Sequence, residues 1–173
     1  MVASVRGLAL QTFGGNAQPR HTIPGPGPTA FKMIDGMDRA TYLVSPGVFD
    51  CAILTVVLPS QPVGGLIGSH RAQGARAMAH YNNFNGPKLD GLKTLFDSIL
   101  RSHAAADNDL VVAIAHHTGA RGKYYDSLAT LVGQALPGLV SLTLHSYGVA
   151  AQGTKLQPVT IYLAPDGQVK GTQ

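Results

Sequence analysis

The sequence contains little of what several protein classes require. It has 173 residues, with one cysteine and no tryptophan, and charged residues make up 13%, about half the usual share of roughly 25%. A single cysteine excludes an intrachain disulfide and any zinc or iron–sulfur site built from several cysteines. The formal net charge is +4, but Lys and Arg form no cluster of the kind that contacts phosphates. We therefore expect no nucleic-acid partner.

Long hydrophobic segments are also missing. The longest apolar stretches have about eight residues, whereas a membrane-spanning helix needs roughly 20. The first residues, MVASVRGLALQTFGG, contain one Arg and no long apolar core, so no secretory signal peptide is evident. The sequence therefore predicts a protein without a membrane span.

Glycine and proline, in contrast, are abundant, with 21 and 11 residues. The run Ile23-Pro-Gly-Pro-Gly-Pro28 cannot continue a helix or a central strand. The length fits one domain of the usual size, about 100–200 residues. We expect residues 1–38 to be a poorly ordered Pro/Gly-rich lead-in arm and residues 39–173 to be a single folded domain.

A buried hairpin is predicted near the middle of the chain. Residues 51–58 form a continuous apolar, β-branched run, which is typical of a strand buried on both faces. A turn at Gly64-Gly65 follows, and residues 65–71 are predicted as the return strand. This arrangement predicts that Cys51 and His70 lie in adjacent strands.

Two amphipathic helices are predicted, at 88–101 and 124–136, because apolar residues recur there at helical spacing. Further strands are predicted at 41–44, 109–115, 139–144 and 159–163, and a turn at Pro165-Asp-Gly167. The expected fold class is α/β (α+β), with a mixed, β-sandwich-like sheet core and two helices packed on one face.

Cys51 is the residue around which chemistry can be built. Cysteine outside disulfides is among the most buried residue types, so a packing role is one interpretation. The other is a nucleophile: a thiol with a pKa of about 8.5 needs a neighbouring base, for which His70 is the candidate. Ser45, six positions before Cys51, is placed to hydrogen-bond the far nitrogen of that histidine. Its alternative role is that of a turn residue before Pro46.

The remaining histidines give weaker signals. His116 and His117 are adjacent in a predicted strand and so point to opposite faces, which disfavours shared ligation of a metal ion. No H-E-x-x-H, G-x-S-x-G or G-K-[ST] motif occurs. His80 and His145 are interpreted as surface residues, with a position on the substrate side of the site as the alternative. We therefore expect no metal and no cofactor.

The segment Ser45-Pro-Gly-Val-Phe-Asp-Cys51, the Gly-rich turn before His70 and the final Pro165-Asp-Gly-Gln-Val169 resemble the Cys-His glutamine deamidase superfamily. Its members include the CheD-like chemoreceptor deamidases and catalytic domains like that of cytotoxic necrotizing factor. The resemblance covers residues 41–171 and lies in layout and spacing. Ser45 stands where CheD-like proteins carry Thr, and Ser69 where they carry Asn before the His. These departures favour a divergent toxin or effector.

The resemblance implies a protein-glutamine deamidase that converts Gln to Glu, with transglutaminase activity where an amine replaces water. Cys51 would be the nucleophile, His70 the base and Ser45 the orienting group. The implied partner is a target protein presenting a glutamine, with an immunity or chaperone protein as a further partner. The site of action would be the cytoplasm of a target cell after export, or the cytoplasm of origin.

Two alternatives remain open at this point. One is a non-catalytic protein-binding module in which Cys51 belongs to the core and the two helices form the partner surface. The other is a chemoreceptor deamidase of the CheD type. In the deamidase interpretation, the target would be recognised by loops near 23–38, 72–87 and 146–157.

Overall fold

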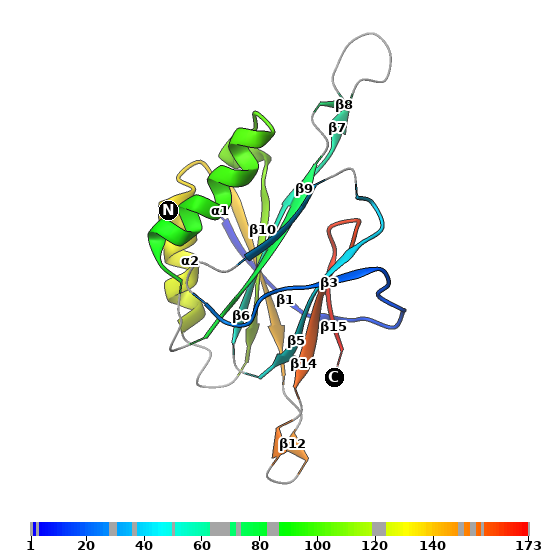
Figure 1. Ribbon diagram of the computed structural model, residues 1–173. Helices are drawn as coiled ribbons and strands as arrows, with labels where there is room; N and C mark the ends of the chain where they lie inside the picture. Colours follow the sequence, from blue (N-terminus) through cyan, green and yellow to red (C-terminus); the bar gives the residue numbers. More distant parts are fainter. Residues whose placement is uncertain are drawn as a thin grey trace.

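The computed structural model describes residues 2, 4–27, 31–35, 38–49, 51–62, 70–71, 74–82, 87–118, 124–148, 151–152, 155–156 and 158–172. Within them the chain forms three layers, with two helices on one side, a six-stranded sheet in the middle and a five-stranded sheet on the other side (Figure 1). This arrangement confirms the predicted fold class of a mixed sheet core with two helices on one face.

The six-stranded sheet is the centre of the molecule. Its strands, in spatial order, are β1 (Ser4–Ala9), β11 (Ser141–Tyr147), β10 (Val111–His117), β6 (Ala52–Leu58), β9 (Ala75–Tyr81) and β4 (Phe31–Asp35). β6 runs antiparallel to both of its neighbours. Because it lies between two layers, β6 is buried on both faces, as its continuous apolar sequence predicts.

The five-stranded sheet covers the face opposite the helices. Its strands, in spatial order, are β2 (Gln11–Thr12), β15 (Val169–Thr172), β14 (Val159–Leu163), β5 (Tyr42–Val48) and β3 (Arg20–Thr22). Burial alternates along β14 and β15, which is the pattern of a sheet with one face toward solvent. The turn predicted between them is confirmed, and Gly167 has a φ of 86° there, a value that glycine adopts without strain.

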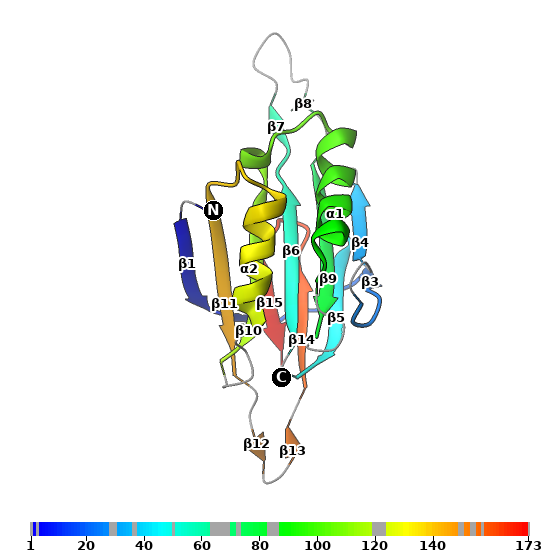
Figure 2. The same cartoon turned by 90° about the vertical axis from the view of Figure 1, so that its left-hand side faces the viewer.

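The helices α1 (Leu89–Ser102) and α2 (Tyr124–Ala135) lie side by side across the larger sheet (Figure 2). Both were predicted, and their bounds agree within two residues. α1 buries Leu92, Leu95, Phe96 and Ile99, which recur at the spacing of one helical face. This stripe packs on the sheet together with Leu128, Val132 and Leu136.

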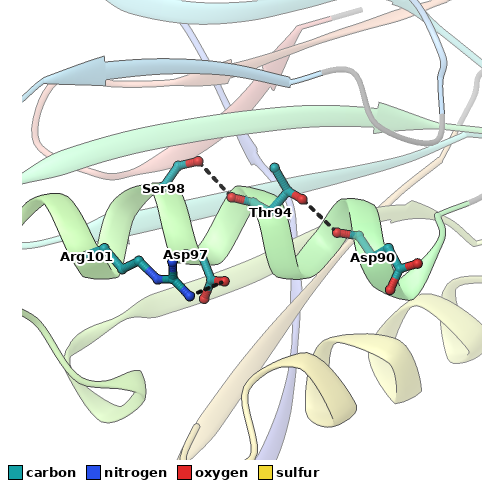
Figure 3. Close-up of polar contacts among 5 residues, drawn as sticks. All are labelled: Asp90, Thr94, Asp97, Ser98 and Arg101. Carbon is teal, nitrogen blue, oxygen red and sulfur yellow. Dashed lines mark hydrogen bonds and ion pairs between the residues drawn. The ribbon is translucent and has the colours of Figure 1, made fainter.

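The solvent face of α1 is held by local polar contacts (Figure 3). The Thr94 hydroxyl donates to the Asp90 carbonyl at 2.9 Å, and the Ser98 hydroxyl donates to the Thr94 carbonyl at 2.7 Å. Arg101 and Asp97 form an ion pair at 3.5 Å. Exposed ion pairs contribute about 0–1 kcal/mol, so the buried stripe, and not this face, holds the helix in place.

The central sheet therefore separates two apolar cores. Along β10, Val112 and Ile114 contact the helices, whereas Ala113 and Ala115 lie between the two sheets. Successive side chains of a strand point to opposite faces, so residue parity decides which core each side chain enters.

The lead-in segment is more ordered than predicted. β1 and β4 form the two edges of the larger sheet, and β2 and β3 form the two edges of the smaller one. All four edge strands thus come from residues 4–35, and the expectation of a poorly ordered arm is wrong for the described part. The Pro/Gly run does interrupt strand structure at 23–27, as proline requires. All residues of β1, β2 and β3 are exposed, and an exposed strand needs no alternation of apolar and polar residues that would reveal it in the sequence.

The return strand of the predicted hairpin is β9, not residues 65–71. β7 (Gln61–Pro62) and β8 (His70–Arg71) form a small separate ladder, and residues 63–69 lie outside the described residues. All seven residues of β9, ARAMAHY, are buried. Its alanines, Arg and His lack the β-branched signature of a strand, which is why the pattern failed there.

A second small hairpin, β12 (Ala151–Gln152) with β13 (Lys155–Leu156), projects from the opposite end of the molecule (Figures 1 and 2). Among the described residues, no helix is both long and apolar enough to cross a membrane.

Replacing Ile23 tests the order of the lead-in segment. Ile23 is 5% exposed and packs between the sheets, and its amide donates to the Val44 carbonyl at 2.9 Å. We expect Ile23→Ala to lower the free energy of unfolding by about 2 kcal/mol or more. The exposed neighbour His21 serves as the control, because His21→Ala should change it by less than about 0.5 kcal/mol. Equal effects in urea unfolding would contradict an anchored segment.

Candidate active site

Cys51 lies where the chain passes from one sheet to the other. β5 of the smaller sheet ends at Val48, and β6 of the larger sheet begins at Ala52. Cys51 is half-buried and packs against the core between the sheets. Its side chain is therefore held at one end of the sandwich, close to the surface.

His80 lies on the strand beside Cys51. β9 pairs with β6 so that Ile53 faces His80 and Ala52 faces Tyr81. Cys51 precedes Ile53 by two residues and contacts the same inter-sheet core, so it lies on the same face and diagonally across from His80. Diagonal neighbours of an antiparallel pair are about 7–8 Å apart between Cα atoms, within reach of longer side chains.

Ser45 completes the group from the other sheet. It is fully buried on β5, and its Oγ lies 3.1 Å from Nδ1 of His80. This hydrogen bond crosses the interior of the sandwich. The predicted contact of Ser45 with a histidine ring is thus present, but the histidine is His80.

Burial sets the protonation state of His80. The side chain is 6% exposed, and its desolvation lowers the pKa from 6.5 to about 4, because the charged form loses its hydration. At neutral pH the ring is therefore uncharged and carries one proton. With that proton on Nδ1 and donated to Ser45, Nε2 offers a lone pair, and Nε2 has no hydrogen-bond partner.

His70 occupies a different part of the chain. Its backbone pairs with Pro62 in the β7–β8 ladder, which follows the Leu58 end of β6, whereas Cys51 precedes the Ala52 end. The neighbours of β6 are β10 and β9, so the expectation that His70 lies in the strand next to Cys51 is wrong. Its side chain lies outside the described residues, and its catalytic role stays a prediction.

Tyr147 and His117 lie on the other side of Cys51. The Tyr147 hydroxyl donates to the Cys51 carbonyl at 2.5 Å, reaching across from β11. The rings of Tyr147 and His117 meet edge to face, with centroids 5.7 Å apart. Their strands end beside the start of β6, so three strands bring polar groups to this end of the sandwich.

A pocket opens next to this group. It has a volume of about 650 Å³, and its walls include Tyr147, Leu10, Phe13, Val159 and Thr172. Tyr147 thus lies between the pocket and the backbone of Cys51. The β12–β13 hairpin projects from the same end of the molecule (Figure 1).

His80 and His145 are both less exposed than the sequence predicts. His80 was expected at the surface and is instead buried. The signal that could have identified it is its parity with Met78 in a run free of strand breakers. His145 is half-buried, and its Nδ1 has no hydrogen-bond partner; burial, with His116 nearby, lowers its pKa. No cluster of three or more potential metal ligands occurs in the described part of the chain.

Comparison with known proteins adds no relative. Neither the models of protein families nor the curated proteins give a significant match to this sequence. The function is therefore inferred from the arrangement of Cys51, His80 and Ser45.

The buried state of His80 predicts a specific loss of stability in acid. Between pH 6.5 and about 4 the unfolded chain binds a proton that the native ring does not. Stability therefore falls as the pH drops through that window. From pH 7 to pH 4.5 we expect this residue alone to remove about 2 kcal/mol from the free energy of unfolding.

The measurement is urea unfolding of the wild type and of His80→Gln at both pH values. The variant lacks the titrating ring, so its loss between the two pH values should be smaller by that amount. All other titrating groups, His145 included, are common to both proteins. Identical losses would contradict a buried neutral His80.

Proposed function

We propose that this protein is a cysteine-dependent amidohydrolase that deamidates a glutamine side chain of a target protein, with Cys51 as nucleophile, His80 as base and Ser45 as the orienting group. The observation that carries the proposal is the hydrogen bond between Ser45 and His80. It fixes a neutral imidazole on the strand next to the only cysteine, on the same face.

The reaction begins with the thiol of Cys51. Its proton moves to Nε2 of His80, and the thiolate attacks the carbon of the glutamine carboxamide. The amide nitrogen gains a proton and leaves as ammonia. Water then loses a proton as it hydrolyses the thioester and releases glutamate, and the proton on His80 returns to the sulfur. An amine in place of water gives transglutamination. These reaction steps need no cofactor.

In the proposed reaction, Ser45 hydrogen-bonds His80 in both its neutral and its charged form. Its Oγ accepts the proton of Nδ1 when the ring is neutral and continues to accept it when the ring is charged, so the tautomer with a basic Nε2 is favoured. Burial opposes the charged ring, but the imidazolium forms beside a thiolate. Opposite charges attract more strongly in a protein interior than in water, which offsets part of the desolvation.

The position of the site supports a protein as the substrate. Cys51 lies half-buried at one end of the sandwich, and Tyr147, whose hydroxyl donates to the Cys51 carbonyl, lines a pocket there. This placement suits a side chain presented by a folded partner. The resemblance to effector-type deamidases adds the expectation that the target is a protein of another cell, reached after export.

Mass spectrometry of lysate proteins tests the proposal. After incubation with the wild type we expect one or a few glutamines converted to glutamate. Cys51→Ser should abolish the conversion, and His80→Gln should lower its rate by about 100-fold or more. Ser45→Ala removes one hydrogen bond to the base and should lower the rate by about tenfold.

His70→Ala is the matched control, since it removes a histidine that the sequence alone favoured. We expect it to retain activity. Loss of activity in His70→Ala together with full activity in His80→Gln would overturn the assignment of the base. Absence of deamidation by the wild type would favour the binding module, with Cys51 in a packing role.

A further inference from the structure

The proposed reaction needs two kinds of proton transfer, and His80 is placed for one of them. Nε2 of His80 is buried and makes no hydrogen bond; in the proposed reaction it exchanges a proton with the thiol of Cys51 and not with solvent. The departing nitrogen must gain a proton, and the attacking water must lose one. Both events occur on the solvent side of Cys51. A second acid–base group that water can reach is therefore required there.

His117 occupies the matching position on the opposite neighbour of β6. The last pair in the antiparallel register of β10 with β6 is Ala115 with Ile53, and continuing that register by two residues would set His117 opposite Cys51. Ala113 and Ala115 lie in the core between the sheets. By strand alternation His117 lies on that same face.

Tyr147 contacts both His117 and Cys51. Its ring contacts the ring of His117, and its hydroxyl bonds the Cys51 carbonyl. Tyr147 is buried, whereas His117 is half-buried. The imidazole of His117 is thus held beside the cysteine and remains open to water, in contrast to that of His80.

We propose that His117 is a second catalytic histidine, which protonates the departing ammonia and then takes a proton from the attacking water. The inference rests on the deamidase chemistry proposed above. In the first half, the thiol proton goes to His80, the S–C bond forms, and the C–N bond breaks as the His117 imidazolium gives its proton to nitrogen. In the second half, neutral His117 takes a proton from water, the C–O bond forms and the C–S bond breaks. The proton on His80 then returns to sulfur.

Because His80 and His117 transfer different protons, acylation of Cys51 by an ester with a good leaving group should not need His117. Nitrophenolate is a stable anion and leaves without being protonated. The acylation step with 4-nitrophenyl acetate therefore needs Cys51 and His80 but not His117, whereas hydrolysis of the acetyl thioester needs His117.

The experiment measures release of nitrophenolate and the mass of the intact protein, for the wild type and three variants. The wild type should show a burst followed by steady turnover. His117→Gln should keep the burst but lose steady turnover by about 100-fold, with the acetyl group accumulating on Cys51. His80→Gln should lose the burst. His116→Gln is the control. His116 is also half-buried, at the adjacent position of β10 and so on the opposite face of the strand, although its Nδ1 lies 3.2 Å from the His117 carbonyl, and the variant should behave as the wild type.

Steady turnover in His117→Gln equal to that in His116→Gln would overturn the proposal. His117→Asn, checked for folding by thermal unfolding, repeats the test with a smaller side chain. Failure of the proposed function has a different signature. A burst with acetyl-Cys51 accumulation in His117→Gln, without glutamine conversion by the wild type, would support the two-histidine site and reject glutamine as its substrate. A wild type with neither a burst nor steady turnover would reject both.

Discussion

The hydrogen bond between Ser45 and His80 is the constraint on which the site depends. It joins the smaller sheet to the larger one through an interior otherwise filled by side chains such as Leu43, Ile53 and Met78. A polar pair in such a core must be satisfied internally, because each partner left alone costs about 1–3 kcal/mol. The bond therefore restricts how the two sheets slide over each other, and it orients the imidazole on the strand beside Cys51.

The six-residue spacing of Ser45 and Cys51 has a geometric origin. β5 carries Ser45 in one sheet, and the chain crosses to β6 in the other sheet between Val48 and Ala52. The serine and the cysteine thus belong to opposite layers but to the same end of the sandwich. His80 lies between the layers and bonds Ser45 through Nδ1, and its strand is the neighbour of the strand that Cys51 precedes.

The parts of the fold that the sequence predicted share one property, a strong hydrophobic pattern. β6 is a continuous apolar run, α1 has an apolar stripe, and β14 is a buried strand before a Pro-Asp-Gly turn. β9 was missed because small residues, Arg76 and His80 fill its buried positions, and no local pattern reports that tertiary contacts will bury them. The choice of His70 over His80 follows from that error, since the return strand decides which histidine lies next to Cys51.

The other buried polar groups sharpen the case for chemistry at His80. Arg76, also on β9, is 4% exposed and donates to the carbonyls of Thr41 and Asp38 at 2.7 and 3.0 Å. These bonds hold the segment before β5, which accounts for a buried cation in structural terms. Thr55 similarly donates to the Ala113 carbonyl.

His80 differs because only one of its ring nitrogens is used. An apolar pair of similar volume at positions 45 and 80 would fill the interior without desolvating an imidazole, and such replacements of buried polar pairs are often neutral or stabilising. Packing alone therefore gives no reason for a histidine here. In the proposed reaction, a ring held at Nδ1 by Ser45 leaves Nε2 to act as the base for Cys51. The stability expected to be lost in acid would then be the cost of keeping that base neutral.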